Sequence, residues 1–330
     1  MPNEESQKII IENNSFEVLD AKEKMTVPDC FVLKNKIGTA HGEAKFYIGQ
    51  DNPNSFEFFD DFSRKCIFLK SDLKRYINEV KKEYDEPEQP YKNKAKMPQQ
   101  WQEYDREIQN LQSEVIAFNL AHQTQIVGPR VYINSSDGIY KFVRKISLPN
   151  ITYLSALKIK SESGEIMYYF KLFVDYFGEE EHPAEIEEVI EEIEEDSSIN
   201  EEDKKSAIKA RKGQGKYREG VLRICPFCPI TIISDDRLLI ASHIKPWAKC
   251  DTTQEKMDSN NGFMLTPTYD FLFDRGYISF NEDKTIIISP WLSKMTLSKL
   301  NISPGKKYPL LPIEGSEAYL DYHRANIFKN

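Results

Sequence analysis

The stretch LLIASHIKPW, residues 238–247, places an apolar, strand-like run directly before a histidine, a lysine and a proline. A histidine at the end of a buried strand can be a packed core side chain. It can also be a base that a rigid element holds toward a substrate. The residues that follow decide between the two interpretations. RLLIASHI (237–244) is predicted to be a strand, residues 244–260 a polar loop, and GFML (262–265) a second strand.

A short helix and a hairpin complete this region. PTYDFLFDR (267–275) has proline at its first turn and is followed by Gly276, a residue typical of a helix C-terminus. GYISF and TIIIS are predicted to pair across the NEDK turn (281–284). Packing of strand, strand and helix would bring His243, Asn261 and Asp270 to one face.

These three residue types suit the hydrolysis of a phosphodiester bond. A neutral imidazole can take a proton from water, since its reference pKa is about 6.5. A carboxylate is a hard oxygen ligand suited to Mg²⁺, which can neutralise charge on the phosphate and the leaving oxygen. An asparagine can bridge the loop backbone and fix the orientation of the histidine.

Five blocks of sequence also resemble one family. They are GQGKYREGVL (213–222), CPIT (228–231), LLIASHIKPW (238–247), NGFMLTPTYDFLFDRGYISF (261–280) and YLDYHRANIF (319–328). In this order they resemble the HNH nucleases of the ββα-metal (His-Me finger) fold, in the branch found among bacterial restriction-type endonucleases. The resemblance covers residues 211–329.

The resemblance assigns a role to each residue of the trio. His243 corresponds to the general base, Asn261 to the middle asparagine, and Asp270 to the position of the last histidine of the motif. Many HNH enzymes carry a metal-binding aspartate just before the base, where this chain has Ser242. The expected cofactor is Mg²⁺, for which Mn²⁺ can substitute, held by Asp270 with waters and phosphate oxygens or with help from Asp274. The favoured role of Asp274 is to cap or brace the end of the helix.

Cysteines and basic residues surround the predicted site. Cys225, Cys228 and Cys250 offer only three ligands, whereas a structural zinc ion usually takes four, so reduced thiols are favoured over a zinc site. His323 and Arg324 fall in a helical pattern near the end of the chain, and core packing is the favoured role for the histidine. The predicted contacts to DNA phosphates are Lys245, Arg275, Arg211, Lys212, Lys216 and Arg218.

The net charge of −9 is unevenly distributed. Residues 179–203 contain fourteen Asp or Glu and no Lys or Arg, whereas residues 204–249 contain eleven Lys or Arg against three Asp or Glu. Such a basic segment favours phosphate binding despite the acidic total, although it can also be a solvated surface. An apolar stripe within 178–203 predicts an acidic linker helix; the alternative is a phosphate mimic that occupies a basic cleft.

The region before the linker, residues 1–177, is predicted to be one α+β domain that recognises DNA or senses a ligand. It shows no zinc-finger or clear helix-turn-helix pattern. The predicted elements are short β-rich runs in 28–70, a helix at 71–84 capped by Ser71 or Asp72, a loop at 84–100, a helix at 101–122, and strands at 130–134, 140–148, 153–160 and 165–177.

The chain lacks the signals of a secreted or membrane protein. There is no run of 18 apolar residues, no signal-peptide pattern at the N-terminus, and the five cysteines are too scattered for a disulfide framework. A cytoplasmic protein is therefore expected. Its length suits two domains, which we place at 1–177 and, after the linker, at 204–330.

Together these features predict an α+β protein with an N-terminal domain, an acidic linker helix and a C-terminal HNH nuclease domain. The predicted function is Mg²⁺-dependent cleavage of double-stranded DNA, as a bacterial restriction enzyme. One site cuts one strand, so double-strand cleavage would need a homodimer or two successive events. The alternatives are an anti-phage effector nuclease activated by a ligand or partner, and a DNA-binding module without catalysis.

Overall fold

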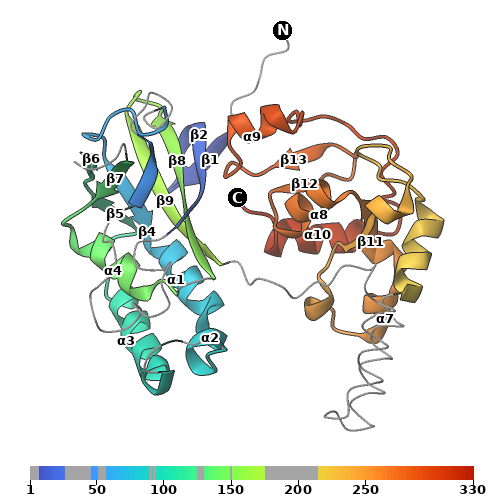
Figure 1. Ribbon diagram of the computed structural model, residues 1–330, viewed down its shortest axis with the longest axis horizontal. Coiled ribbons are helices and arrows are strands. Elements are labelled where there is room, and N and C mark those ends of the chain that lie inside the picture. Colours follow the sequence, from blue (N-terminus) through green and yellow to red (C-terminus); the bar gives the residue numbers. More distant parts are fainter. Residues whose placement is uncertain are drawn as a thin grey trace. The chain divides into compact units, whose positions relative to one another are not determined.

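The chain folds into two compact units, each of which combines helices and strands (Figure 1). The first unit comprises residues 1–177 and 290–296, and the second comprises residues 178–289 and 297–330. The predicted α+β class is confirmed. The computed structural model describes residues 7–26, 46–50, 57–88, 91, 94–124, 130–148, 151–174 and 215–330. The acidic linker (178–203), Arg211 and Lys212 lie outside these residues.

The first unit is built on two sheets. Its strands are β1 (Lys8–Ile11), β2 (Asn14–Thr26), β3 (Phe46–Gln50), β4 (Cys66–Leu69), β5 (Val115–Phe118), β6 (Ala121–Thr124), β7 (Arg130–Asn134), β8 (Thr152–Ser161) and β9 (Ile166–Val174). The larger sheet has the order β1-β2-β8-β9-β4-β5, in which only the β4–β9 pair is parallel. The smaller sheet has the order β3-β7-β6.

Helices of the first unit bury apolar faces against the larger sheet and each other. They are α1 (Lys70–Glu79), α2 (Lys81–Asp85), the 3₁₀ turn η3 (Lys94–Lys96), α3 (Met97–Gln109) and α4 (Gly138–Ile146). α1 packs on β9 and α3, and its buried Leu73, Tyr76 and Ile77 follow the helical period (Figure 1). The predicted N-cap is wrong. Leu69 holds that position, and Asp72 is buried in an ion pair with Lys171.

Two predicted elements of this unit are wrong. Residues 140–148 were predicted to be a strand, but they form most of α4, because Tyr140, Val143 and Ile146 meet the core at a spacing of three. The predicted helix at 101–122 ends at Gln109, and β5 and β6 follow it. Lys70 Nζ donates to the carbonyls of Gln109 and Leu111, which fixes the chain after the helix.

Residues 290–296 leave the second unit and belong to the first. Trp291 is only 1% exposed and lies edge-on to Tyr169 and Phe173 of β9, with ring centroids 5.1 Å apart in both pairs. Glu23 of β2 accepts from the Ser293 N–H (2.6 Å) and the Thr296 hydroxyl (2.9 Å). No pattern in the sequence predicted this exchange between units.

The second unit contains the predicted succession of strand, loop, strand, helix and hairpin. Its elements include a helix at 215–224, η5 (Asp236–Leu238), β10 (Ile240–His243), η6 (Trp247–Lys249), α7 (Thr253–Met257), η7 (Ser259–Asn261), β11 (Gly262–Leu265), α8 (Pro267–Asp274), β12 (Ile278–Phe280), β13 (Ile286–Ile288) and α10 (Glu317–Asn326). α9 (Lys294–Lys299) begins in residues assigned to the first unit.

Local signals in this unit were predicted well. β10 pairs antiparallel with β11, β12 pairs antiparallel with β13, and α8 lies against both β10 and β11. Gly276 ends α8 with a φ of +69°, as its place in the sequence predicted. Among the described residues, no helix combines the length and apolar composition that a membrane span needs.

We predict that Trp291→Ala lowers the free energy of unfolding of the first unit by about 3–5 kcal/mol, because it removes a buried aromatic side chain. Met295→Ala, at a side chain that is 62% exposed in the same stretch, should cost less than about 0.5 kcal/mol. Urea unfolding, with hydrogen exchange of the β8–β9 amides as the local probe, measures both. Equal effects of the two variants would contradict the role assigned to Trp291.

Candidate active site

His243 is the last residue of β10 and is fixed from both sides by backbone pairing. It stands opposite Gly262 in the antiparallel β10–β11 ladder. Directly after it, the Ile244 N–H donates to the carbonyl oxygen of Asn261 (3.0 Å). The backbone of the histidine is therefore held by a rigid element, and only its ring remains to be oriented.

The ring of His243 is oriented by three neighbours. It stacks on Tyr217, with 3.9 Å between centroids and 11° between planes, and lies edge-on to Trp247 at 5.6 Å. Its Nε2 is 3.2 Å from the carbonyl oxygen of Lys256. Because a carbonyl can only accept, Nε2 must carry the proton and Nδ1 keeps its lone pair. Within the described part of the chain, no group forms a hydrogen bond with Nδ1.

Burial controls the charge of this ring. It lowers the pKa of His243 to about 4, and the hydrogen bond to the Lys256 carbonyl opposes the shift only in part. The imidazole is consequently neutral at pH 7. A neutral ring whose Nε2–H is hydrogen-bonded, and whose Nδ1 keeps its lone pair, can accept a proton from a water molecule at Nδ1.

His323 of α10 provides a comparison within the same unit. It is 1% exposed and stacks on Phe273, with 4.0 Å between centroids. Its Nε2 donates to the Phe273 carbonyl (2.9 Å), and its Nδ1 is 3.0 Å from the hydroxyl of Ser279. Both ring nitrogens are used inside the protein, as the predicted packing role requires. His243 shares the aromatic stack and the carbonyl but not the second partner.

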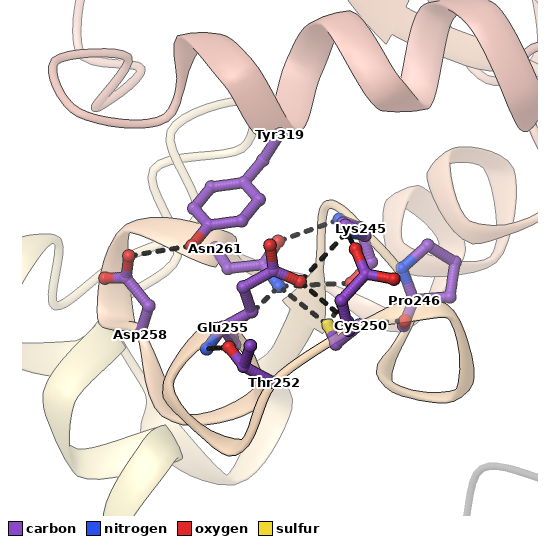
Figure 2. A network of polar contacts seen from close by, with 9 residues as sticks. Lys245, Pro246, Cys250, Thr252, Glu255, Asp258, Asn261 and Tyr319 are labelled. Atoms are coloured by element: carbon purple, nitrogen blue, oxygen red, sulfur yellow. Dashed lines mark hydrogen bonds and ion pairs between the residues drawn. The ribbon is translucent and has the colours of Figure 1, made fainter.

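Asn261 is fully buried, and its amide group clamps the loop that follows the histidine (Figure 2). Its Oδ1 accepts from the Lys245 N–H (2.8 Å), and its Nδ2 donates to the carbonyls of Lys245 (3.1 Å) and Glu255 (3.2 Å). Glu255 immediately precedes Lys256, whose carbonyl oxygen accepts the hydrogen bond from the His243 Nε2–H. The asparagine thus sets the position of the group that orients the ring.

Lys245 and Arg218 are engaged within the protein, although both were predicted to contact DNA. Lys245 is 7% exposed, and its ammonium pairs with Asp251 (2.7 Å) and Glu255 (2.9 Å), which raise its pKa (Figure 2). Arg218 donates to the carbonyls of Leu239 (2.8 Å) and Asp236 (2.6 Å). These side chains brace the loop and the start of β10, so neither presents a free cation to a phosphate.

Lys256 is a cation that the sequence analysis missed. Its ammonium lies 5.4 Å over the ring of Trp247, which itself meets the edge of His243. Among the described residues, no carboxylate forms an ion pair with Lys256. Of the predicted contacts, Lys216 is exposed and Arg275 is one-third exposed beside Asp274 (3.4 Å). The polar loop 244–260 has no periodicity that could have singled out Lys256.

Asp270 lies in the first turn of α8, where its N–H donates to the Thr266 carbonyl (2.9 Å). Because α8 packs on β10 and β11, Asp270 belongs to the same ββα unit as His243 and Asn261. Mg²⁺ is commonly held by one or two carboxylates together with waters and substrate phosphates, so the chemistry of Asp270 fits this ion. Asp274, the second predicted ligand, is paired with Arg275.

The three cysteines of the possible zinc site are not assembled as a ligand set. Cys225 donates to the Phe227 carbonyl, and Cys250 lies 3.5 Å from the carbonyls of Lys245 and Pro246. Burial raises the pKa of both thiols and keeps them protonated. The described residues contain no group of three or more His, Cys, Asp or Glu placed to hold a metal ion.

We predict that the stability of the second unit falls as the pH is lowered from about 6.5 toward 4. The folded-state pKa of both His243 and His323 is about 4, below the value of about 6.5 in an unfolded chain. Between these values the unfolded chain binds more protons, so the stabilisation present above pH 6.5 is lost on acidification.

The same linkage gives a variant test. His323→Gln removes one of the two titrations and should reduce the slope of the unfolding free energy against pH by about half between pH 5 and 6. Urea unfolding of the full chain at a series of pH values measures this slope. An unchanged slope in the variant would show that His323 does not titrate as its burial requires.

One comparison with known proteins covers the part of the chain that contains these residues. Residues 225–281 match the family model described as HNH endonuclease, and the matched segment contains β10, β11 and α8 with His243, Asn261 and Asp270. No curated protein matches the chain. The second unit therefore carries an HNH endonuclease domain, the catalytic domain of a nuclease that hydrolyses phosphodiester bonds.

Proposed function

We propose that the protein is a Mg²⁺-dependent endonuclease of double-stranded DNA. The HNH match supports the reaction class. The observation that carries the proposal is the state of His243, whose Nε2 is committed to the Lys256 carbonyl while Nδ1 keeps its lone pair. The comparison with His323, where both nitrogens are occupied, distinguishes a base from a packed histidine.

In this mechanism His243 is the general base. Its Nδ1 takes a proton from the attacking water, and the Lys256 carbonyl then stabilises the imidazolium through the Nε2–H. The depressed pKa keeps the ring neutral, and therefore able to accept a proton, in the free enzyme. Binding of an anionic phosphate beside the ring raises its pKa and strengthens the base at the moment of reaction.

Asp270 would hold the metal ion, with Asp274 as the second candidate. When bound, Mg²⁺ supplies positive charge that stabilises the phosphate and the leaving oxygen. Asn261 acts through the backbone, because its side-chain amide forms hydrogen bonds with the backbone of Lys245 and Glu255. Its contribution is to keep the loop, and with it the Lys256 carbonyl, in register with the base.

The phosphate contacts we propose differ from those predicted from the sequence. Lys256 replaces Lys245, because Lys245 is neutralised by Asp251 and Glu255 whereas Lys256 lies over Trp247 beside the base. Exposed Lys216 and partly exposed Arg275 remain candidates. An unpaired cation near His243 would draw the phosphodiester toward the ring edge that carries Nδ1.

A bacterial restriction enzyme is the biological role we propose, with target recognition in the first unit. The restriction-type sequence blocks and the division into two units support it. Selectivity would come from contacts of the first unit to base edges or to a modified base. A single HNH site per chain leads us to propose a homodimer for double-strand cleavage.

We predict that His243→Ala lowers the cleavage rate at least about 100-fold, since it removes the general base. DNA affinity should stay within about twofold, because the ring acts on water. Digestion of unmodified and fully methylated phage DNA with Mg²⁺ measures the first, and filter binding in Ca²⁺ the second. Discrete fragments from the wild type alone support restriction, whereas equal cutting by the variant removes His243 from its role.

We predict that Lys256→Gln weakens DNA binding and reduces the slope of log K against log salt by about one, as the loss of one phosphate contact requires. Lys284→Gln removes the same charge from the β12–β13 turn and serves as the matched control. Binding of a DNA duplex is measured at a series of salt concentrations. If both variants have the wild-type slope, Lys256 does not contact phosphate.

A further inference from the structure

Tyr217 contacts both His243 and Asn261, yet it lies outside the matched segment 225–281. It comes from the helix at 215–224 and is 3% exposed. Its ring stacks on His243, and its hydroxyl donates to the carbonyl oxygen of Asn261 (2.8 Å). One side chain therefore bridges the end of β10 and the residue before β11.

The neighbouring glycine shows how closely this tyrosine is seated. A Cβ added to Gly262 would lie 2.0 Å from the Tyr217 hydroxyl oxygen and 3.1 Å from Cγ2 of Val221. The φ of Gly262 is −161°, which any residue can adopt, so backbone conformation is not the reason for glycine here. The close approach of Tyr217 is the reason. Gly262, the residue that pairs with His243 in the ladder, therefore has no side chain, and Tyr217 occupies the space that a Cβ would take.

The stack limits what the imidazole can do. With an aromatic plane 3.9 Å away at 11°, tilting of the imidazole out of its plane brings it into the tyrosine. A half-turn of the ring would replace the Nε2–H at the Lys256 carbonyl with a C–H and lose that hydrogen bond. Tyr217 and Lys256 together therefore leave one arrangement, in which Nδ1 is the open nitrogen.

We propose that Tyr217 is a positioning residue for the general base: its ring holds the plane of His243, and its hydroxyl ties that ring to the Asn261 carbonyl. The inference rests on the proposed function, since it takes His243 to be the base. It adds Tyr217, which lies in the block GQGKYREGVL (213–222) and before the matched segment 225–281, to the residues that form the site.

The ring and the hydroxyl contribute differently. The Asn261 carbonyl also accepts from the Ile244 N–H (3.0 Å), so it keeps a donor when the tyrosine hydroxyl is removed. Tyr217→Phe therefore preserves the stack and leaves no buried carbonyl without a partner. Tyr217→Leu removes the stack itself. Val221→Ala, one helical turn further on and also against Gly262, creates space at the same strand without touching the His243 stack.

The test compares these three variants with the wild type in single-turnover cleavage and in DNA binding. Tyr217→Leu should slow cleavage at least about tenfold with DNA affinity within about twofold, because a misoriented base loses part of its contribution. Tyr217→Phe keeps the stack and loses only the hydroxyl that anchors the ring, so its rate should lie between those of Tyr217→Leu and the wild type. Val221→Ala should stay within about threefold of the wild-type rate. Urea unfolding confirms that each variant is folded under the assay conditions.

Nitrogen NMR of the histidine rings gives a readout that does not depend on cleavage. The wild type and Tyr217→Phe should show His243 with its proton on Nε2 alone, and Tyr217→Leu a mixture of the two tautomers. Cleavage by Tyr217→Leu at the wild-type rate, or an equal loss in Val221→Ala, overturns the proposal. If wild type and His243→Ala cut equally, the nuclease mechanism fails instead, and the tautomer comparison still decides whether Tyr217 holds the ring.

Discussion

The buried amide of Asn261 is the constraint on which the rest of the site depends. Three hydrogen bonds join the side-chain amide to the backbone at Lys245 and Glu255. The main-chain carbonyl of Asn261 accepts hydrogen bonds from the Ile244 N–H and the Tyr217 hydroxyl. A buried amide that lost these partners would carry a desolvation cost of about 1–3 kcal/mol for each unsatisfied group. The hydrogen bonds of Asn261 therefore hold the loop after β10 in place. The Lys256 carbonyl, which orients the His243 ring, lies on that loop.

The two buried histidines show why a residue type alone does not define a function. His243 and His323 each stack on an aromatic ring, each donate Nε2–H to a carbonyl, and each have a pKa lowered by burial to about 4. They differ at Nδ1, where Ser279 meets His323. A histidine whose hydrogen bonds are all made inside the fold has no lone pair to offer a water molecule. The open nitrogen is what makes His243 a candidate base.

Local signals predicted much of the second unit, and long-range contacts account for what was missed. β10, β11, α8 and the stop at Gly276 follow from apolar runs, a proline and a glycine within a few residues of each other. α4 was misread because its apolar residues at 140, 142 and 146 also fit the period of a strand. The seating of Tyr217 and the return of Trp291 to the first unit depend on partners dozens of residues away. Such partners leave no periodic trace in the sequence.

The basic segment illustrates the same limit in electrostatic terms. Its formal excess of positive charge suggested a phosphate-binding surface, but part of that charge is consumed within the unit. Lys245 forms ion pairs with two carboxylates, and Arg237 forms one with Asp235. Arg218 donates its hydrogen bonds to backbone carbonyls. Only cations that remain unmatched in the folded state can exchange their counterions for a phosphodiester. In the proposed complex with DNA, the electrostatic field is therefore set by tertiary pairing. Lys256, near the proposed base His243, forms no ion pair with a carboxylate of the described residues, whereas Lys245, two residues after His243, is paired with Asp251 and Glu255.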